Sequence, residues 1–259
     1  MSERRLRLIV EYDGTDFLGF QRQAGGRTVQ AVLEEALSRY TPAPTVFAAG
    51  RTDAGVHARA QVIHFAYAGR VPVTKLAAVL NGQLPNDVAI RDCREAAPGF
   101  HARYSALGRT YCYRLLRAEG RLPLVERYAW RIAGELDVLA MTEAAVLLLG
   151  THSFRRFGRI PGSLEQRRRS QETRGWRRTI FRSEVQQRSN TLCFAIEADA
   201  FLTHMVRALV GALVAIGRGR LSAAGLGAAL ADETTDRAVA PIAPPHGLCL
   251  FRVRYPDEW

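Results

Sequence analysis

Two successive runs of strand and helix patterns, each close to half of the 259 residues, constrain the fold of this chain most. The first run predicts strands at 6–12, 46–49, 61–65 and 88–93 and helices at 29–40 and 74–81. The second run predicts strands at 110–117, 192–198 and 248–254 and helices at 136–149 and 204–216. Such runs indicate an α+β protein with paired sheets rather than one doubly wound parallel sheet.

No Gly-Ser linker separates the two runs, so we expect them to share an interface. We place the boundary between an N-terminal α/β subdomain of residues 1–105 and a C-terminal α/β subdomain of residues 106–259. The apolar positions of the two helices in the second run are expected to be core: Leu139, Val146, Leu147, Leu209, Leu213 and Ile216.

The charge of the chain points to an acidic polymer as its partner. Lysine plus arginine exceed aspartate plus glutamate by 36 to 25, a formal net charge of +11, and Lys75 is the only lysine. A generally basic surface, or a codon bias toward arginine, is the alternative. No stretch of about 20 apolar residues occurs, and Met1–Arg5 leads into a strand pattern. We therefore expect a cytoplasmic protein with no membrane partner.

The cysteines and histidines do not have the spacing of a metal site. Four cysteines lie far apart without a Cys-x-x-Cys pair, at Cys93, Cys112, Cys193 and Cys249. We interpret them as reduced packing residues. The six histidines form no pair at helical i, i+4 spacing, so the sequence predicts chemistry without a metal.

One segment, Ala49–Ala58, combines a carboxylate with two glycines and an arginine directly after an apolar run. Gly50 and Gly55 can take backbone angles closed to other residues, which predicts a sharp turn that carries Asp53. Because glycines add no bulk, a large planar substrate can approach the backbone while Arg51 reaches the same anion. Asp53 is therefore our candidate reactive group, with an ordinary turn as the alternative.

Blocks spread along most of the chain carry a family resemblance. They are Glu11–Gly14, Gly19–Gln23, Arg51–His57, Phe100–Ala106, Tyr111–Tyr113, Phe201–Arg207 and Gly247–Leu250. In residues and order they resemble the tRNA pseudouridine synthase A family, whose members modify the anticodon stem-loop of tRNA. The resemblance implies two related subdomains that share a continuous, mainly antiparallel sheet with a central catalytic cleft. It also implies isomerisation of uridine to pseudouridine at positions 38, 39 and 40, no cofactor, and a homodimer that grips the tRNA.

The resemblance assigns two main roles. Asp53 matches the family's essential aspartate, which acts either as a nucleophile or as a base on the ribose, and the resemblance does not decide between them. Tyr111 matches the active-site tyrosine. Because Tyr111, Tyr113 and Leu115 share one strand face, the Tyr111 ring is placed to stack on the flipped uracil, with ordinary strand packing as the alternative.

Supporting roles are expected for Arg51, Arg207 and Leu248. Arg207 lies on an otherwise apolar helix, so it is expected to pair with Asp53 and favour its charged form, unless it reaches solvent instead. Leu248 would form an aliphatic wall beneath the flipped ring, although a core leucine fits the same pattern. Arg51 is expected to steady phosphate or to fill the space that the base leaves.

Residues 155–182 are rich in arginine and read as a mobile basic loop leading into a strand. Arg167, Arg168 and Arg169 are our candidates for contacts with RNA phosphates, and a solvated insertion is the alternative.

Two rival functions remain at this point. One is a noncatalytic RNA-binding protein in which Asp53 only shapes a turn. The other pairs Asp53 with His57 as a hydrolytic acid–base dyad, although no serine or cysteine nucleophile motif lies nearby.

Overall fold

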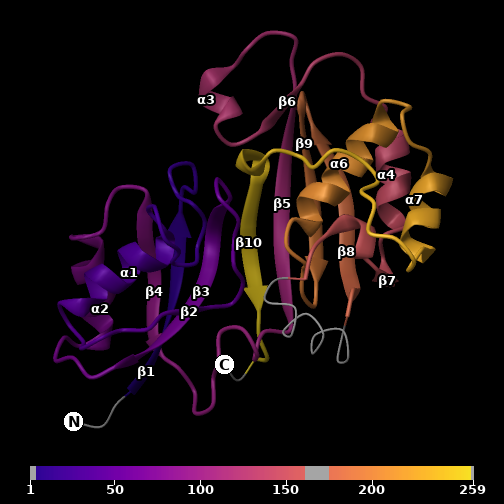
Figure 1. The fold of residues 1–259 in the computed structure, drawn as a ribbon. Coiled ribbons are helices and arrows are strands. Elements are labelled where there is room, and N and C mark those ends of the chain that lie inside the picture. Colours follow the sequence, from indigo (N-terminus) through magenta and orange to yellow (C-terminus); the bar gives the residue numbers. More distant parts are fainter. Residues whose placement is uncertain (1–3, 161–174, 258–259) are drawn as a thin grey trace. The chain divides into compact units, whose positions relative to one another are not determined.

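The computed structural model describes residues 4–160 and 175–257 (Figure 1). The chain divides into two compact units. The first runs up to Arg109 and includes the segment from Cys249 on, and the second comprises Thr110–Leu248. This division differs from the expected two-part scheme in one element, because the last strand, expected in 106–259, packs with the first unit.

The first unit is a sheet with two helices. Its strands are β1 (Arg4–Tyr12), β2 (Phe47–Ala48), β3 (His57–Tyr67), β4 (Val88–Glu95) and β10 (Leu248–Arg254). Its helices are α1 (Val29–Ser38) and α2 (Val73–Asn81). The strand order is β4-β1-β3-β10, with β2 paired to β3. β1 is antiparallel to both its neighbours, whereas β10 runs parallel to β3.

Local sequence signals explain the helix that covers this sheet. The Thr28 side chain accepts a hydrogen bond from the Ala31 amide and caps the start of α1. The buried positions of α1 recur at helical spacing, at Val29, Leu33, Ala36 and Leu37. α1 thus begins where the sequence predicts it.

The second unit combines a sheet with a helical layer. Its strands are β5 (Gly108–Arg117), β6 (Trp130–Ile132), β7 (Gly150–Ser153), β8 (Arg177–Arg188) and β9 (Thr191–Ala198). Its helices are α3 (Pro123–Glu126), α4 (Val138–Val146), α6 (Met205–Gly217) and α7 (Ala223–Ala231), with 3₁₀ turns η1 (Arg155–Phe157) and η2 (Pro245–Gly247). The strand order is β5-β9-β8-β7, and α4 packs on β8, α6 and α7. The expected α+β class with mainly antiparallel strands is confirmed.

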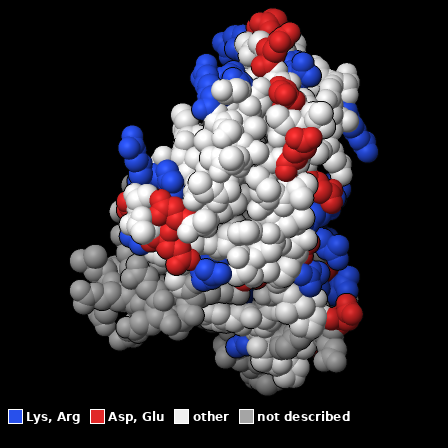
Figure 2. Space-filling view, turned by 90° about the vertical axis from the view of Figure 1, so that its right-hand side faces the viewer, with Lys and Arg blue, Asp and Glu red and all other residues white. Residues whose placement is uncertain are grey.

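The prediction that Leu139, Val146 and Leu147 of α4 are core residues is wrong. Leu139 is 70% exposed, and Val146 and Leu147 are exposed as well. The buried side chains are instead Met141, Ala144, Ala145 and Leu148. The charged side chain of Glu143 is exposed on the same side of the helix as Leu139. Figure 2 shows one side of the molecule, on which charged side chains surround a broad area without them. The expectation is confirmed for α6, where Leu209, Leu213 and Ile216 are all buried.

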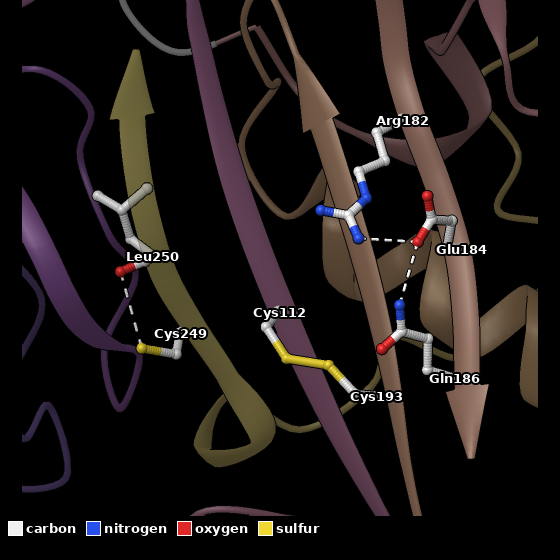
Figure 3. The surroundings of a disulfide bond; sticks show 7 residues. All are labelled: Cys112, Arg182, Glu184, Gln186, Cys193, Cys249 and Leu250. Carbon is white, nitrogen blue, oxygen red and sulfur yellow. Dashed lines mark hydrogen bonds and ion pairs between the residues drawn. A yellow bond between two sulfur atoms is a disulfide. The ribbon is translucent and has the colours of Figure 1, made fainter. Parts of the chain in front are cut away.

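The interpretation of all four cysteines as reduced residues is also wrong. Cys112 on β5 and Cys193 on β9 form a disulfide, although 81 residues separate them (Figure 3). β5 and β9 are neighbours in the sheet, which explains how the two thiols meet. Gln186 on β8 lies opposite Cys193, and its side chain donates to Glu184, which also pairs with Arg182. Cys93 and Cys249 take no part in this disulfide, and Cys249 Sγ lies 3.7 Å from the Leu250 carbonyl oxygen (Figure 3).

No helix among the described residues is long and apolar enough to cross a membrane.

Candidate functional site

Asp53 lies in the loop between β2 and β3 of the first unit, where its side chain is half-buried. The backbone of this loop is fixed on both sides of the carboxylate. The Thr52 carbonyl accepts from the Phe20 amide at 3.0 Å, and the Asp53 carbonyl accepts from the Val56 amide at 3.2 Å. Gly55 has a φ of 74°, the left-handed conformation that favours glycine, and its amide donates to the Phe17 carbonyl.

The start of the loop is held by hydrogen bonds among the buried side chains of Tyr12, Thr52 and Gln61. The Tyr12 and Thr52 hydroxyls lie 2.8 Å apart, and Gln61 donates to the Gly50 carbonyl at 2.7 Å. Burial raises the pKa of Tyr12, so its hydroxyl keeps its proton. A carboxylate on such a loop is positioned before substrate arrives, which is the geometry that a nucleophile or a general base requires.

A second loop, residues 13–20, packs directly on the Asp53 loop. A Cβ on Gly14 would lie 2.0 Å from the Val56 carbonyl oxygen, and one on Gly19 would lie 2.7 Å from the Thr52 carbonyl oxygen. Only glycine permits this approach, and Gly19 has a positive φ of 100°. This contact explains why Glu11–Gly14 and Gly19–Gln23 accompany the Arg51–His57 block in the sequence.

His57 takes part in the same contact. Its Nδ1 lies 3.0 Å from the Gly14 amide nitrogen and 3.0 Å from Asp13 Oδ1. The ring is buried and is directed at the 13–20 loop through this nitrogen. His57 therefore anchors the second loop, which is a structural role.

Arg109 is a buried residue of this region that the sequence analysis missed. Its guanidinium donates twice to the Ala49 carbonyl, at 2.9 and 3.3 Å, and also to the carbonyls of Arg103 and Ala106. It thus ties the residue before Gly50 to the 101–106 loop. A charged residue within a buried strand pattern is the signal that would have found it, just as a charge on an otherwise apolar helix singled out Arg207.

Arg51 is exposed at the edge of the Asp53 loop. Partial burial lowers the pKa of Arg51, and the charge of Arg103 lowers it further. The phenol of Tyr104 acts in the opposite direction. Arg51, Arg103 and Tyr104 are therefore close enough to interact, beside the candidate reactive carboxylate.

The remaining predicted site residues lie in the second unit. Tyr111 is buried on β5, and the centroid of its ring lies 5.2 Å from that of Phe201 at an interplanar angle of 89°. Tyr113 and Leu115 are buried like Tyr111, whereas Cys112 is less buried, as period-two alternation predicts. The shared strand face expected for Tyr111, Tyr113 and Leu115 is confirmed.

Arg207 and Leu248 are linked to β5 through residues 243–247, which directly precede Leu248. Arg207 Nε donates to the Ala243 carbonyl at 2.8 Å, and the Tyr113 hydroxyl donates to the neighbouring Pro244 carbonyl at 2.8 Å. A Cβ on Gly247, which precedes Leu248, would lie 2.7 Å from the Tyr113 ring. Tyr113 therefore contacts the segment that joins Arg207 to Leu248. It lies two residues from Tyr111 on β5.

The residue before α6 is backbone-strained. His204, at the start of the helix that carries Arg207, has a φ of 65°, which is unusual for a residue with a side chain. Strain of this kind persists where surrounding structure fixes it and clusters at functional sites.

Part of the arginine-rich segment contacts the protein itself. Arg155 donates to the Glu233 carbonyl, Arg156 to the Arg237 carbonyl, and Arg177 pairs with the Glu233 carboxylate at 2.9 Å. The loop expected up to residue 182 ends earlier, because β8 begins at Arg177. Arg167, Arg168 and Arg169 lie outside the described residues.

Asp53 and Arg51 thus belong to the first unit, and Tyr111, Arg207 and Leu248 to the second. The pairing of Arg207 with Asp53 stays a prediction. Among the described residues, no group of three or more His, Cys, Asp or Glu side chains is arranged to hold a metal ion.

Comparison with known proteins adds independent information. A family model described as tRNA pseudouridine synthase matches residues 8–105 and 144–256. A protein named tRNA pseudouridine synthase A from Moorella thermoacetica is 43% identical over 255 residues, which cover 96% of this chain and 99% of that protein. One of the same name from Frankia casuarinae is 46% identical over 260 residues, covering 98% and 90%. Another, from Syntrophotalea carbinolica, is 39% identical over 254 residues, covering 98% and 97%.

The first matched range includes the Asp53 loop and its supporting 13–20 loop, and the second includes Arg207 and Leu248. Identity at this level extends over nearly the whole of this chain and of each relative. The chain therefore belongs to the tRNA pseudouridine synthase family, a family of isomerases.

Proposed function

We propose that this enzyme isomerises uridine to pseudouridine at positions 38, 39 and 40 in the anticodon stem-loop of tRNA, with Asp53 as the essential carboxylate. One observation carries the proposal. Asp53 stands on a loop whose backbone is held on both sides by hydrogen bonds, within a segment that the family model matches. A cytoplasmic location is expected for an enzyme that acts on tRNA.

The reaction breaks the bond between uracil N1 and the ribose, turns the free base, and joins it again through C5. The C5 proton is lost and N1 gains one, so no oxidant, reductant or second substrate is consumed. A single positioned carboxylate fits this chemistry, either by attacking the sugar or by removing a ribose proton. Neither rival function fits an isomerase family, and His57 Nδ1 is engaged by the 13–20 loop.

Tyr111, Arg207 and Leu248 are proposed to complete the site. The target nucleotide must leave its stack, which costs a few kcal/mol, and a stacked tyrosine ring offsets part of that cost. The Phe201 ring packs perpendicular to the Tyr111 ring and supports its orientation. Arg207 is proposed to favour the charged carboxylate of Asp53, and Leu248 to form the wall beneath the base.

The primary experiment incubates the protein with unmodified tRNA and maps pseudouridine by position. Asp53→Asn should bind tRNA with unchanged affinity, because phosphate contacts elsewhere carry most of the binding, but should form no product. Substantial product from Asp53→Asn in a single turnover would show that another group performs the chemistry. Modification only outside positions 38, 39 and 40 would refute the assigned specificity.

The role of Tyr111 can be separated from packing by its neighbour on the same face. Tyr111→Ala should lose far more activity than Tyr113→Ala when both variants are equally folded, although both lose a buried ring of the same strand face. Circular dichroism should first show that both variants are folded. Equal activity losses would move the base-binding role away from Tyr111.

We further propose that a second copy of this chain covers the exposed side of α4, where Leu139, Val146 and Leu147 surround Glu143. Clustered exposed apolar side chains mark contact surfaces, and symmetric homodimers are the commonest oligomers. A homodimer would also supply a second surface to hold the rest of a tRNA.

Light scattering tests this proposal. The wild type should have the mass of a dimer, and Leu139→Glu combined with Val146→Glu should give a monomer. Leu124→Glu is the matched control, since Leu124 is a 91% exposed leucine on α3 rather than on α4. A monomeric wild type with full activity, or a dimer that survives the double substitution, would refute the proposed interface.

A further inference from the structure

A cluster of aromatic rings lies on the first unit next to the Asp53 loop, and the proposed chemistry does not use it. It consists of Phe47 on β2, His64 on β3, and His101 and Tyr104 in the loop before β5; we call it the aromatic platform. Its outer rings face solvent, since Tyr104 is 77% and Phe47 46% exposed. Exposed aromatic rings that touch one another are costly to leave in water and are typical of binding surfaces.

The rings of the platform form a continuous series. The centroid of Tyr104 lies 4.3 Å from that of His101, which lies 4.5 Å from His64 and 5.7 Å from Phe47. Phe47 and His64 are stacked at 5.1 Å with an interplanar angle of 22°. The exposed rings thus rest on a buried one, because His64 is only 4% exposed.

Hydrogen bonds fix the loop that presents Tyr104. His101 Nδ1 accepts from the amides of Arg103 and Tyr104, and the backbone and hydroxyl of Ser105 bond back to His101. His64 Nδ1 accepts from the Ala102 amide at 3.1 Å, and Arg109 holds the Arg103 carbonyl. Burial, together with the charge of His101, lowers the pKa of His64 to about 4, so this acceptor stays unprotonated near neutral pH. A ring on such a loop loses little freedom on binding.

Positive charge borders the platform on the side of the reactive loop. The Arg103 guanidinium lies 5.7 Å from the centroid of the Tyr104 ring, and Arg51 is close enough to sense both Arg103 and Tyr104. Arg51 is two residues from Asp53 in the chain. Stacking rings beside guanidinium groups are the combination by which proteins hold unpaired nucleotides of RNA.

We infer that the aromatic platform binds an unpaired nucleotide of the anticodon loop, whose base stacks on Tyr104 while Arg51 and Arg103 contact the adjoining phosphates. The inference rests on the proposed function for the identity of the RNA. It adds a second base-binding position outside the catalytic centre, next to the nucleotide that is modified. Such a contact would help to keep the loop open once the target base leaves the stack.

Equilibrium binding tests the inference without turnover if every protein carries Asp53→Asn. Tyr104→Ala should weaken binding of full-length tRNA by roughly 5- to 150-fold, and Tyr104→Phe should restore it, because stacking needs only the ring. The dependence of log Kd on log salt should keep its slope in Tyr104→Ala. Arg103→Ala should instead flatten the slope by about 0.7, the contribution of one phosphate contact to a single strand.

Tyr128→Ala is the matched control. Tyr128 is also an exposed tyrosine with an arginine beside it, Arg127 at 6.0 Å, but it lies outside the platform. It should leave the affinity within about twofold of the parent, inside ordinary error of a surface substitution.

A scan of abasic sites identifies the nucleotide. Each anticodon-loop nucleotide is made abasic in turn, and one of these RNAs should bind the parent more weakly while binding Tyr104→Ala no differently from intact tRNA. If no abasic position shows this coupling, or if Tyr104→Ala binds like the parent, the inference is wrong even when wild-type protein makes pseudouridine. If wild-type protein makes none but the coupling is present, the platform stands and the proposed function fails. A change in oligomeric mass without a change in RNA affinity would make Tyr104 a contact between copies and overturn the inference.

Discussion

Replacing Arg109 with alanine tests whether the first unit depends on the guanidinium that joins the Ala49 carbonyl to the 101–106 loop. The two hydrogen bonds to Ala49 are buried, whereas those to Arg103 and Ala106 are partly buried. Leaving a buried acceptor without its donor costs about 1–3 kcal/mol, and each partly buried bond contributes about 1 kcal/mol net. Arg109→Ala should therefore lower the free energy of unfolding by about 4 kcal/mol.

That loss is large beside a typical total stability of about 5–15 kcal/mol. For a chain of this length, about 4 kcal/mol corresponds to a fall in Tm of roughly 8–16 °C. Urea denaturation followed by fluorescence measures the free energy directly, and calorimetry measures Tm. Arg109→Lys should lie between the two proteins, because one ammonium group cannot reach three carbonyls in the geometry of a guanidinium fork.

Arg91→Ala is the control for Arg109→Ala. Arg91 is an arginine of the same unit whose ion pair with Glu11, at 3.3 Å, is exposed to solvent. Exposed pairs contribute about 0–1 kcal/mol, so this variant should remain close to wild type. If Arg109→Ala loses no more stability than Arg91→Ala, with an unchanged urea m value, the hydrogen bonds to the three carbonyls do not stabilise the unit as argued.

Four further predictions concern other parts of the molecule. Gly14→Ala should lower the single-turnover rate by about 10²-fold at unchanged tRNA affinity, because its Cβ would lie 2.0 Å from the Val56 oxygen and displace the Asp53 loop; an unchanged rate would show that the contact yields. Reducing Cys112–Cys193, which spans 81 residues, should lower the free energy of unfolding by up to about 4.5 kcal/mol, and the Cys112→Ser and Cys193→Ser double variant should not respond to reductant. His64 has a pKa of about 4 in the folded protein, so the unfolded chain binds the proton first as pH falls. The neutral His64 ring therefore contributes up to about 3 kcal/mol to the free energy of unfolding, fully above about pH 6.5, and this contribution is lost toward pH 4. His64→Gln should flatten this pH dependence in urea unfolding. Changing Arg167, Arg168 and Arg169 to alanine should flatten the salt slope of tRNA binding by roughly two units, and an unchanged slope would exclude phosphate contacts there.

The sequence predicts the elements with strong periodicity and clear caps. α1 begins after Thr28 as expected, and β1, β3, β5, β9 and β10 all include the strands predicted from alternation. It misjudges α4, because apolar side chains lie on both faces of the helix, and the prediction did not use the charge of Glu143, which marks the exposed face that carries Leu139, Val146 and Leu147. β7 was not predicted, and β8 begins inside a segment read as an arginine-rich loop, since charge concealed its alternation.

In the candidate site, too, the sequence predicts local features but not contacts between residues far apart in the chain. The Asp53 turn is local, so its glycines and its carboxylate are visible in ten consecutive residues. A charge within a buried strand pattern singles out Arg109, but its partner Ala49, like the pairing of Cys112 with Cys193, lies at a distance in the sequence that only the fold brings together. Tyr113 shows the same limit, because its hydroxyl bonds to a residue 131 positions away.

The discontinuity of the first unit has a consequence for biosynthesis. On the ribosome, β3 and the loop that carries Asp53 are made before residues 110–248, but Cys249 and Leu250 of β10, which pair with His57 and Ala58, are made after them. The second unit is continuous in sequence and can complete its own contacts first. The start of β3, which follows the Asp53 loop, therefore pairs with β10 only after nearly 140 intervening residues have emerged and folded. In refolding of the whole chain, closure of the same long loop imposes a similar delay. Completion of the Asp53 loop is thus coupled to prior synthesis of the unit that carries Tyr111 and Arg207.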